Sequence, residues 1–185
     1  MKHQHRIFIA SHLPDNLKHF LIDYQERKLN DSCFRIVSDQ ALHLTLIFIG
    51  DVFDNDLSKV IQACQSSTDS AFPITVQLDK ITYGPSPQFP RLVWVEGKSS
   101  QELSNFHENL KRKLIDNGVN FKIENHLFRP HITLARINKE CNQGLSLLEI
   151  EEKTDKFFKI GAISIIESEL TSQGPKYTTL NTFEF

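Results

Sequence analysis

Two short histidine–threonine motifs contain the residue types most suited to chemistry. The sequence HLTL at residues 43–46 returns as HITL at residues 131–134, 88 positions later. Side chains two residues apart in a β-strand lie on the same face. Each motif therefore presents a histidine beside a threonine, His43 with Thr45 and His131 with Thr133. One such motif would mean little, because threonine is common in strands, but its return in the second half favours a functional site.

Two imidazoles and two hydroxyls that meet across a cleft suit phosphoryl transfer. Histidine titrates near neutral pH, so one ring can accept a proton while the other supplies one. Threonine hydroxyls can donate to the non-bridging phosphate oxygens, which carry the charge in the transition state. His43 is the candidate general acid and His131 the candidate general base, and the sequence leaves the reverse assignment open. We expect no metal or other cofactor, because no carboxylate cluster is available to hold a metal ion.

Residues near the motifs are candidates for substrate contacts, each with a structural alternative. Arg129 shares the strand face of His131 and would add positive potential, or it is a surface arginine. Phe48 could stack on a base, although strand parity places it with the apolar core. Tyr177 follows a Gly-Pro turn and could reach the cleft rim or pack structurally. Arg136 lies at an odd offset from His131, so periodicity alone makes it a solvated surface charge.

Strands alternating with helices must position these motifs. Apolar residues at helical spacing predict helices over residues 15–29, from Asp54 onward, and behind a Ser99–Glu102 capping box, with Gly118 as a stop signal. Strand-like segments cover residues 6–13, 33–37, 42–49, 72–82, 91–96, 128–137, 157–170 and 177–185. Groups of strands separated by helices, without a Ser/Pro-rich linker, predict one α+β domain over residues 1–185 with mixed or antiparallel sheets.

Composition and charge limit the classes of function. The chain has 185 residues and a net charge of −2, which does not suit coating long nucleic acid but permits binding at a nucleic-acid end. No apolar run approaches the roughly 18 residues of a membrane span, so we expect no membrane association and a cytoplasmic protein. Cys33, Cys64 and Cys141 are far apart, and we expect three reduced, mostly buried thiols.

The remaining histidines are expected to take no part in the chemistry. His3 and His5 belong to a terminus that we expect to be flexible, and His107 and His126 are expected to be bystanders. His12 ends the first strand and is the one that could approach the cleft.

The two motifs resemble the signature of the two-histidine phosphoesterase superfamily. Their contexts, LHLTLIFIG at 42–50 and FRPHITLAR at 128–136, look like those of the LigT-like RNA 2′,3′-cyclic phosphodiesterases, historically called bacterial and archaeal 2′-5′ RNA ligases. The likeness continues through residues 6–14, 90–95 and 165–180. One minor departure is Ile49, where a leucine is more usual before the glycine.

The resemblance implies a bilobal α+β fold with pseudo-twofold symmetry, one HxT motif in each lobe, and two sheets that line a central cleft with helices outside. It implies hydrolysis of a terminal 2′,3′-cyclic phosphate to a 2′-phosphomonoester and a weak, reversible 2′-5′ RNA ligase activity. It raises Arg136 to a phosphate or ribose contact. The partners would be RNA ends bearing the cyclic phosphate, tRNA fragments among them, and the protein would be a monomer.

Two rival interpretations stay open. The protein could be a phosphodiesterase of small molecules such as cyclic nucleotides, 2′-5′ oligoadenylates or ADP-ribose cyclic phosphate, and relative turnover of a dinucleotide and a mononucleotide cyclic phosphate would separate the two. It could also be a non-catalytic nucleotide-binding module, which would bind nucleotide tightly without turnover. The presence of all four motif residues disfavours the module.

Overall fold

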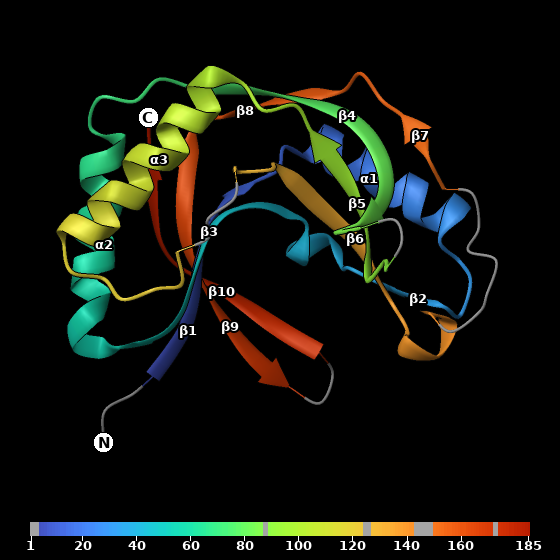
Figure 1. The fold of residues 1–185 in the computed structure, drawn as a ribbon, viewed down its shortest axis with the longest axis horizontal. Coiled ribbons are helices and arrows are strands. Elements are labelled where there is room, and N and C mark those ends of the chain that lie inside the picture. Colours follow the sequence, from blue (N-terminus) through green and yellow to red (C-terminus); the bar gives the residue numbers. More distant parts are fainter. Residues whose placement is uncertain (1–3, 87–88, 124–126, 143–149, 172–173) are drawn as a thin grey trace.

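Two antiparallel sheets, each carrying one histidine–threonine motif, form the framework of the molecule (Figure 1). The structure is a computed structural model, and it describes residues 4–86, 89–123, 127–142, 150–171 and 174–185. The first sheet has the order β10 (Gly174–Glu184), β9 (Ala162–Thr171), β1 (Gln4–His12) and β3 (His43–Phe53). The second has the order β2 (Phe34–Ile36), β6 (His131–Ile137), β5 (Leu92–Gly97), β4 (Ile74–Gly84) and β7 (Glu152–Lys153), and β8 (Phe157–Ile160) also pairs with β4.

In the described part of the chain, three helices lie outside the sheets, as the α+β prediction requires. Helices α2 (Asp54–Thr68) and α3 (Gln101–Asp116) pack together beside the first sheet, and α1 (Asp15–Lys28) packs on β6 of the second (Figure 1). Short 3-10 turns, Asp39–Ala41 and Lys139–Asn142, precede β3 and follow β6. The fold-class prediction is confirmed, with every strand pair between described residues antiparallel.

Helix α3 shows how its sequence sets its limits. The hydroxyl of Ser100 accepts a hydrogen bond from the Leu103 backbone N–H at 3.1 Å, so the N-cap is one residue after the predicted Ser99. The apolar residues that follow the cap at helical spacing are all buried: Leu103, Phe106, Leu110 and Leu114. Gly118 has a φ of +71°, which glycine adopts readily after a helix end.

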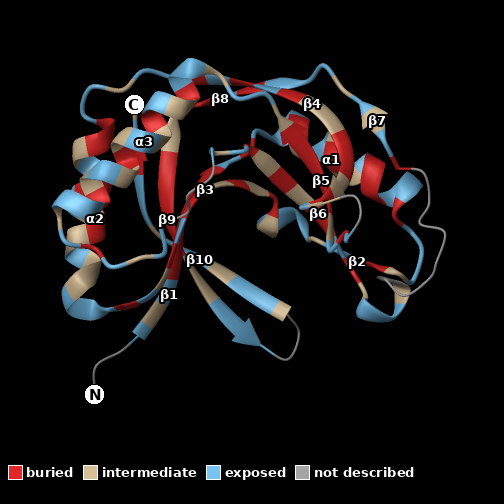
Figure 2. Ribbon diagram, viewed as in Figure 1, coloured by how far each residue is buried: buried red, intermediate tan, exposed pale blue. Residues whose placement is uncertain are grey.

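Some predicted strand ends are wrong. Strand β3 continues through Gly50, whose φ is +91°, and ends at Phe53 instead of stopping at the glycine. The predicted strand over residues 157–170 divides into β8 and β9 at Gly161. Strands β9 and β10 form a hairpin that extends away from the buried middle of the molecule (Figure 2). Most of its residues near the turn are exposed.

Candidate active site

An inserted residue in each motif strand decides which side chains share a face with the histidine. In β3, Ala10 is opposite Thr45 and Ile9 is opposite Ile47, so Leu46 has no direct partner. In β6, Thr133 is opposite Trp94 and Ala135 is opposite Val93, so Leu134 is the corresponding extra residue. A β-bulge reverses the alternation of side chains beyond it. The residues five positions after each histidine, Phe48 and Arg136, therefore turn to the histidine–threonine face.

The two bulges correct two predictions made from ideal strand parity. Phe48 is 48 % exposed and lines the cleft, whereas parity had placed it in the core. Arg136 lines the same cleft beside His131 and Thr133, whereas parity had placed it on the opposite surface. The family resemblance implies a phosphate or ribose contact for Arg136, and its position on the cleft wall would allow that contact.

Each catalytic candidate ring is anchored by the backbone two residues before it. His131 Nδ1 lies 2.9 Å from the carbonyl oxygen of Arg129. Because a carbonyl can only accept, Nδ1 carries the hydrogen, which leaves Nε2 for proton exchange. The backbone of Ala41, two residues before His43, acts as a hydrogen-bond partner that raises the pKa of the His43 ring. Both imidazoles are thus held in matched settings by the two lobes.

Aromatic neighbours fix the planes of the two rings. His43 stacks on Phe8 with ring centroids 4.8 Å apart, and Tyr177 meets it edge-on at 5.6 Å. His131 lies against Trp94 at 4.4 Å with a tilt of 46°. Tyr177 therefore contacts the first motif directly, and Trp94 is both buried and part of the site. Side chains packed in this way hold a proton-transfer group in one orientation.

The electrostatic environment of His43 favours its neutral form in the unliganded protein. Burial lowers the pKa of His43 to about 4, with smaller contributions from positive charge on His12 and His131, while the Ala41 hydrogen bond opposes the shift. His12 is the cross-strand partner of His43, so it lies beside the first motif. Burial also lowers the pKa of His12. At neutral pH the free cleft would therefore hold His43 uncharged.

One polar cavity brings the motif residues together. It has a volume of about 540 Å³, and its walls include His43, Thr45, His131, Thr133 and Arg136, together with Phe48 and Tyr177. Hydroxyl, imidazole and guanidinium donors that point into one small space suit a tetrahedral oxyanion such as phosphate.

A second, more apolar cavity of about 790 Å³ adjoins the first and shares Thr45, Phe48 and His131 with it. Its other walls include Trp94, Phe121 and Phe128. Flat aromatic faces of this kind are where unpaired bases stack. The arrangement therefore provides a polar place for a phosphate and an adjoining aromatic place for a base.

Arg129 lines the second cavity, and its backbone carbonyl accepts a hydrogen bond from the His131 ring. Its guanidinium pairs with the Glu96 carboxylate and lies 5.3 Å from the centre of the Trp94 ring. Trp94 Nε1 donates to the same Glu96 oxygen at 2.9 Å. Because the Arg129 carbonyl holds the His131 ring, this partly buried cluster supports the position of the candidate base. No sequence signal pointed to Glu96, which reads as one acid among 23 acidic residues.

Two helix side chains that sequence reasoning missed hold the bulges. Gln25 in α1 is buried and donates to the carbonyls of Leu134 at 2.8 Å and Val37 at 2.9 Å. His107 in α3 has its Nε2 3.1 Å from the carbonyl of Leu46. A side chain from α1 thus donates to the carbonyl of the inserted Leu134, and one from α3 donates to the carbonyl of the inserted Leu46. His107, expected to be a bystander, is a neighbour of the site and lines the second cavity.

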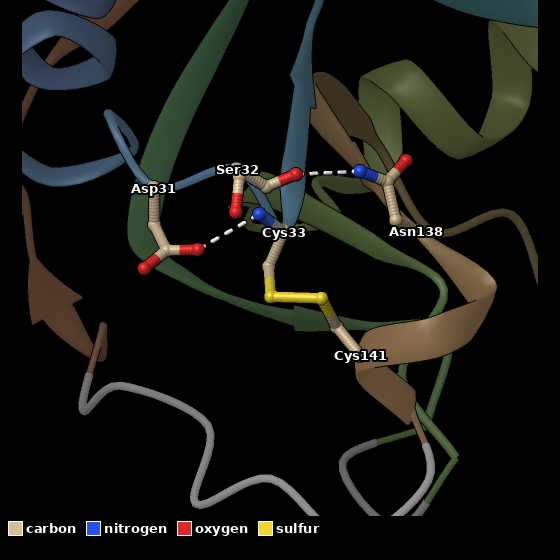
Figure 3. Close-up of a disulfide and its surroundings, with 5 residues drawn as sticks. All are labelled: Asp31, Ser32, Cys33, Asn138 and Cys141. Atoms are coloured by element: carbon tan, nitrogen blue, oxygen red, sulfur yellow. Dashed lines mark hydrogen bonds between the residues drawn. A yellow bond between two sulfur atoms is a disulfide. The ribbon is translucent and has the colours of Figure 1, made fainter.

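Two other expectations from the sequence are wrong. His5 is not in a flexible terminus: it belongs to β1 and bridges Glu167 at 2.6 Å and Asp54 at 2.9 Å. Cys33 and Cys141 form a disulfide between the segment before β2 and the turn after β6, so they are not reduced thiols (Figure 3). Cys64 is the buried free thiol that was expected. His3 and His126 lie outside the described residues.

Within the described ranges, no helix is long and apolar enough to cross a membrane. The same residues contain no group of three or more histidine, cysteine or acidic side chains placed to hold a metal ion.

The fold places one histidine–threonine motif on each of the two sheets, and both motifs line one cavity. The sequence matches the 2′-5′ RNA ligase superfamily over residues 13–171, and the chain belongs to this family. This confirms the resemblance to the LigT-like enzymes.

Relatives align over about four fifths of the chain or more. An RNA 2′,3′-cyclic phosphodiesterase of Methanothermobacter thermautotrophicus is 26 % identical over 182 residues, covering 96 % of this chain and 97 % of the relative. One from Aeropyrum pernix is 33 % identical over 150 residues, covering 79 % and 83 %. The fold also matches TT0787 of Thermus thermophilus (TM-score 0.85, 23 % identity, 97 % of each chain) and E. coli LigT complexed with 3′-AMP (0.79, 21 %, 98 % of each).

Proposed function

We propose that the protein is a metal-independent RNA 2′,3′-cyclic phosphodiesterase that produces a 2′-phosphomonoester. The observation that carries the proposal is the polar cavity into which both motifs converge, with His43 and His131 each anchored by the backbone two residues earlier. The family membership and the names of relatives that align over nearly the whole chain support it. In this proposal residues 1–185 act as a single two-lobed domain, with one motif from each lobe.

The proposed reaction is an in-line displacement at phosphorus. His131 Nε2 removes a proton from water as its oxygen bonds to phosphorus, and His43 protonates the 3′ oxygen as its bond to phosphorus breaks. Thr45, Thr133 and Arg136 donate to the non-bridging oxygens, which hold the transition-state charge. When a 5′-hydroxyl replaces water, the same displacement joins two RNA ends through a 2′-5′ linkage. Reversing that ligation exchanges the roles of the two histidines.

Because the pKa of His43 is low in the free protein, the bound substrate must help to protonate this candidate acid. A general acid must hold a proton before it can donate one, and burial keeps His43 uncharged in the free cleft at neutral pH. A phosphate anion beside the ring favours the imidazolium and so raises this pKa. The proposed acid is therefore protonated together with phosphate binding.

The proposed substrate is an RNA end, tRNA fragments included. Phe48 offers a stacking face between the two cavities, and Tyr177 closes the phosphate cavity beside His43. Arg129 reaches the second cavity from its ion pair with Glu96. We propose that the protein acts as a cytoplasmic monomer.

The decisive experiment is incubation of an oligonucleotide 2′,3′-cyclic phosphate with the protein in the presence of EDTA. The expected product is a 2′-phosphate, identified by its resistance to a 3′-specific phosphomonoesterase and by phosphorus NMR. Loss of activity on chelation, or a 3′-phosphate product, would contradict the mechanism. Tight binding without turnover of any cyclic phosphate or 2′-5′ substrate would identify a non-catalytic nucleotide-binding module.

A further inference from the structure

We propose that Arg35 and Arg136 form a second phosphate subsite, which binds a phosphate on the 5′ oxygen of the terminal nucleotide. The inference rests on the proposed function and deepens it, because it defines the substrate class as one with two neighbouring phosphates. Arg136 would stand between the two phosphates, and Arg35 is assigned to the outer one.

The first observation is an arginine pair directly opposite each other on neighbouring strands. Arg35 of β2 is the register partner of Arg136 of β6. Directly opposed residues of an antiparallel pair share a face, with their Cβ atoms about 4.5–5.5 Å apart. Both side chains are exposed and both line the polar cavity. Like charges in this arrangement destabilise a sheet, so an anion between them would remove a cost that the free protein bears.

The second observation is the absence of a countercharge among the described residues. No carboxylate lines this cavity in the described part of the chain, and neither Arg35 nor Arg136 forms an ion pair there. Some other cations of the described chain do have a carboxylate partner, Arg129 with Glu96 and Lys80 with Glu151 among them. In a protein with a net charge of −2, this is a local concentration of positive charge.

A third arginine approaches from the other lobe. Arg6 of β1 lines the same cavity, with its guanidinium 5.4 Å from the centre of the Phe48 ring. Its register partner is Asp51, so it is less isolated from negative charge than Arg35. Arg6 can contribute to the field, but Arg35 is the side chain that best tests the subsite.

The charge count points to a second phosphate. A cyclic phosphate diester carries a single negative charge, and the two threonines, the two histidines and Arg136 already provide donors for it. Arg35 lies one strand beyond Arg136, at the outer edge of the second sheet. The next phosphate of a nucleotide chain is separated from the cyclic phosphate only by the ribose and its 5′ carbon. The neighbour of Arg136 is therefore where that phosphate would lie.

This chemistry has two sources, a 5′-phosphomonoester and the phosphodiester of an oligonucleotide. Three substrates distinguish them: adenosine 2′,3′-cyclic phosphate, its 5′-phosphorylated form, and the dinucleotide ApA with a cyclic phosphate end. We expect a 5′-phosphate in either form to lower KM by about 10-fold or more, the usual strength of a charge-assisted hydrogen bond, with a smaller change in kcat. A gain with the dinucleotide alone would assign the subsite to the phosphodiester.

The variant Arg35→Gln should remove most of this gain. We expect its loss in kcat/KM to be at least about 5-fold larger on the two 5′-phosphorylated substrates than on adenosine 2′,3′-cyclic phosphate. Arg112→Gln makes the same charge change on exposed helix α3 and serves as the matched control. Equal losses on all three substrates, or no preference for a 5′-phosphate in the unmodified protein, would overturn the inference.

A binding measurement keeps this test separate from catalysis. Calorimetry should show adenosine 2′,5′-bisphosphate binding about 10-fold tighter than adenosine 2′-phosphate, and Arg35→Gln should largely abolish the difference. If the protein binds the bisphosphate more tightly than the monophosphate but turns over no cyclic phosphate, the subsite stands and the proposed function is overturned. Turnover with equal binding of both ligands would overturn the subsite and leave the proposed function standing, and absence of both binding and turnover would overturn both.

Discussion

At the scale of single residues, the mechanism depends on two imidazoles that belong to different sheets. Replacing His43 or His131 with alanine should lower kcat by about 10²–10⁴-fold, the usual contribution of a positioned acid or base. Initial rates on an oligonucleotide 2′,3′-cyclic phosphate, with circular dichroism to verify folding, measure the effect. His19→Ala, at an exposed position of α1, is the control and should retain activity. A folded His131→Ala protein with full activity would contradict the paired mechanism.

The buried setting of His43 makes its titration depend on the ligand. Burial lowers its pKa to about 4 in the free protein, and the anionic group of a bound adenosine 2′-phosphate should raise it toward the ordinary value of 6.5. Proton uptake then accompanies binding between the free and bound pKa values, so affinity should increase as pH falls through that interval. NMR titration of the His43 ring with and without ligand measures the shift. An unchanged pKa in the complex would favour His131 as the acid.

At the scale of elements, the helices, most strands and the four motif residues were predictable because their signals are local. A histidine and a threonine two positions apart share a face in any strand, so Thr45 and Thr133 followed directly from the sequence. Phe48 and Arg136 did not, because their faces depend on bulges that ideal alternation omits. Each inserted residue is an ordinary leucine, and the side chains that hold its carbonyl come from helices distant in the sequence.

Gln25 connects helix packing to the position of Arg136. Gln25→Met keeps the length of the side chain but removes two donated hydrogen bonds, to the carbonyls of Leu134 and Val37. We expect a loss of about 1–3 kcal/mol in the free energy of unfolding, because a buried carbonyl is left without its donor. Urea unfolding measures it. Gln65→Met, at an exposed position of α2, is the matched control, and equal effects of the two substitutions would disprove the role of Gln25.

At the scale of the whole molecule, the meeting of the two motifs was predictable, but the disulfide between Cys33 and Cys141 was not. The motif repeat itself indicated two facing strands, and the polar cavity has both. The cysteines gave no such signal, because 108 residues separate Cys33 from Cys141 and only the pairing of β2 with β6 brings them together. Hydrogen bonds reinforce the same junction. The Asn138 side chain donates to the carbonyl of Ser32 at 2.6 Å (Figure 3). The Asn138 backbone N–H donates to the carbonyl of Cys33 at 2.8 Å.

This junction leads to a prediction about stability and redox environment. The Cys33→Ser/Cys141→Ser double variant should lose about 2–4 kcal/mol of unfolding free energy, because the cross-link no longer restricts the unfolded chain. For a chain of this size each kcal/mol lowers Tm by roughly 2–4 °C. Differential scanning calorimetry with and without dithiothreitol measures the effect of losing the disulfide by substitution and by reduction.

Reduction of the natural chain should lower Tm as the double variant does, and the reductant should leave the variant unchanged. Activity at 25 °C should largely persist in both, because the backbone pairing of Arg35 with Arg136 does not need the sulfur bridge. That persistence matters for a cytoplasmic location, where thiol buffers keep most cysteines reduced. Loss of activity in parallel with reduction would instead mean that the bridge positions β2, and with it Arg35, at the edge of the cleft.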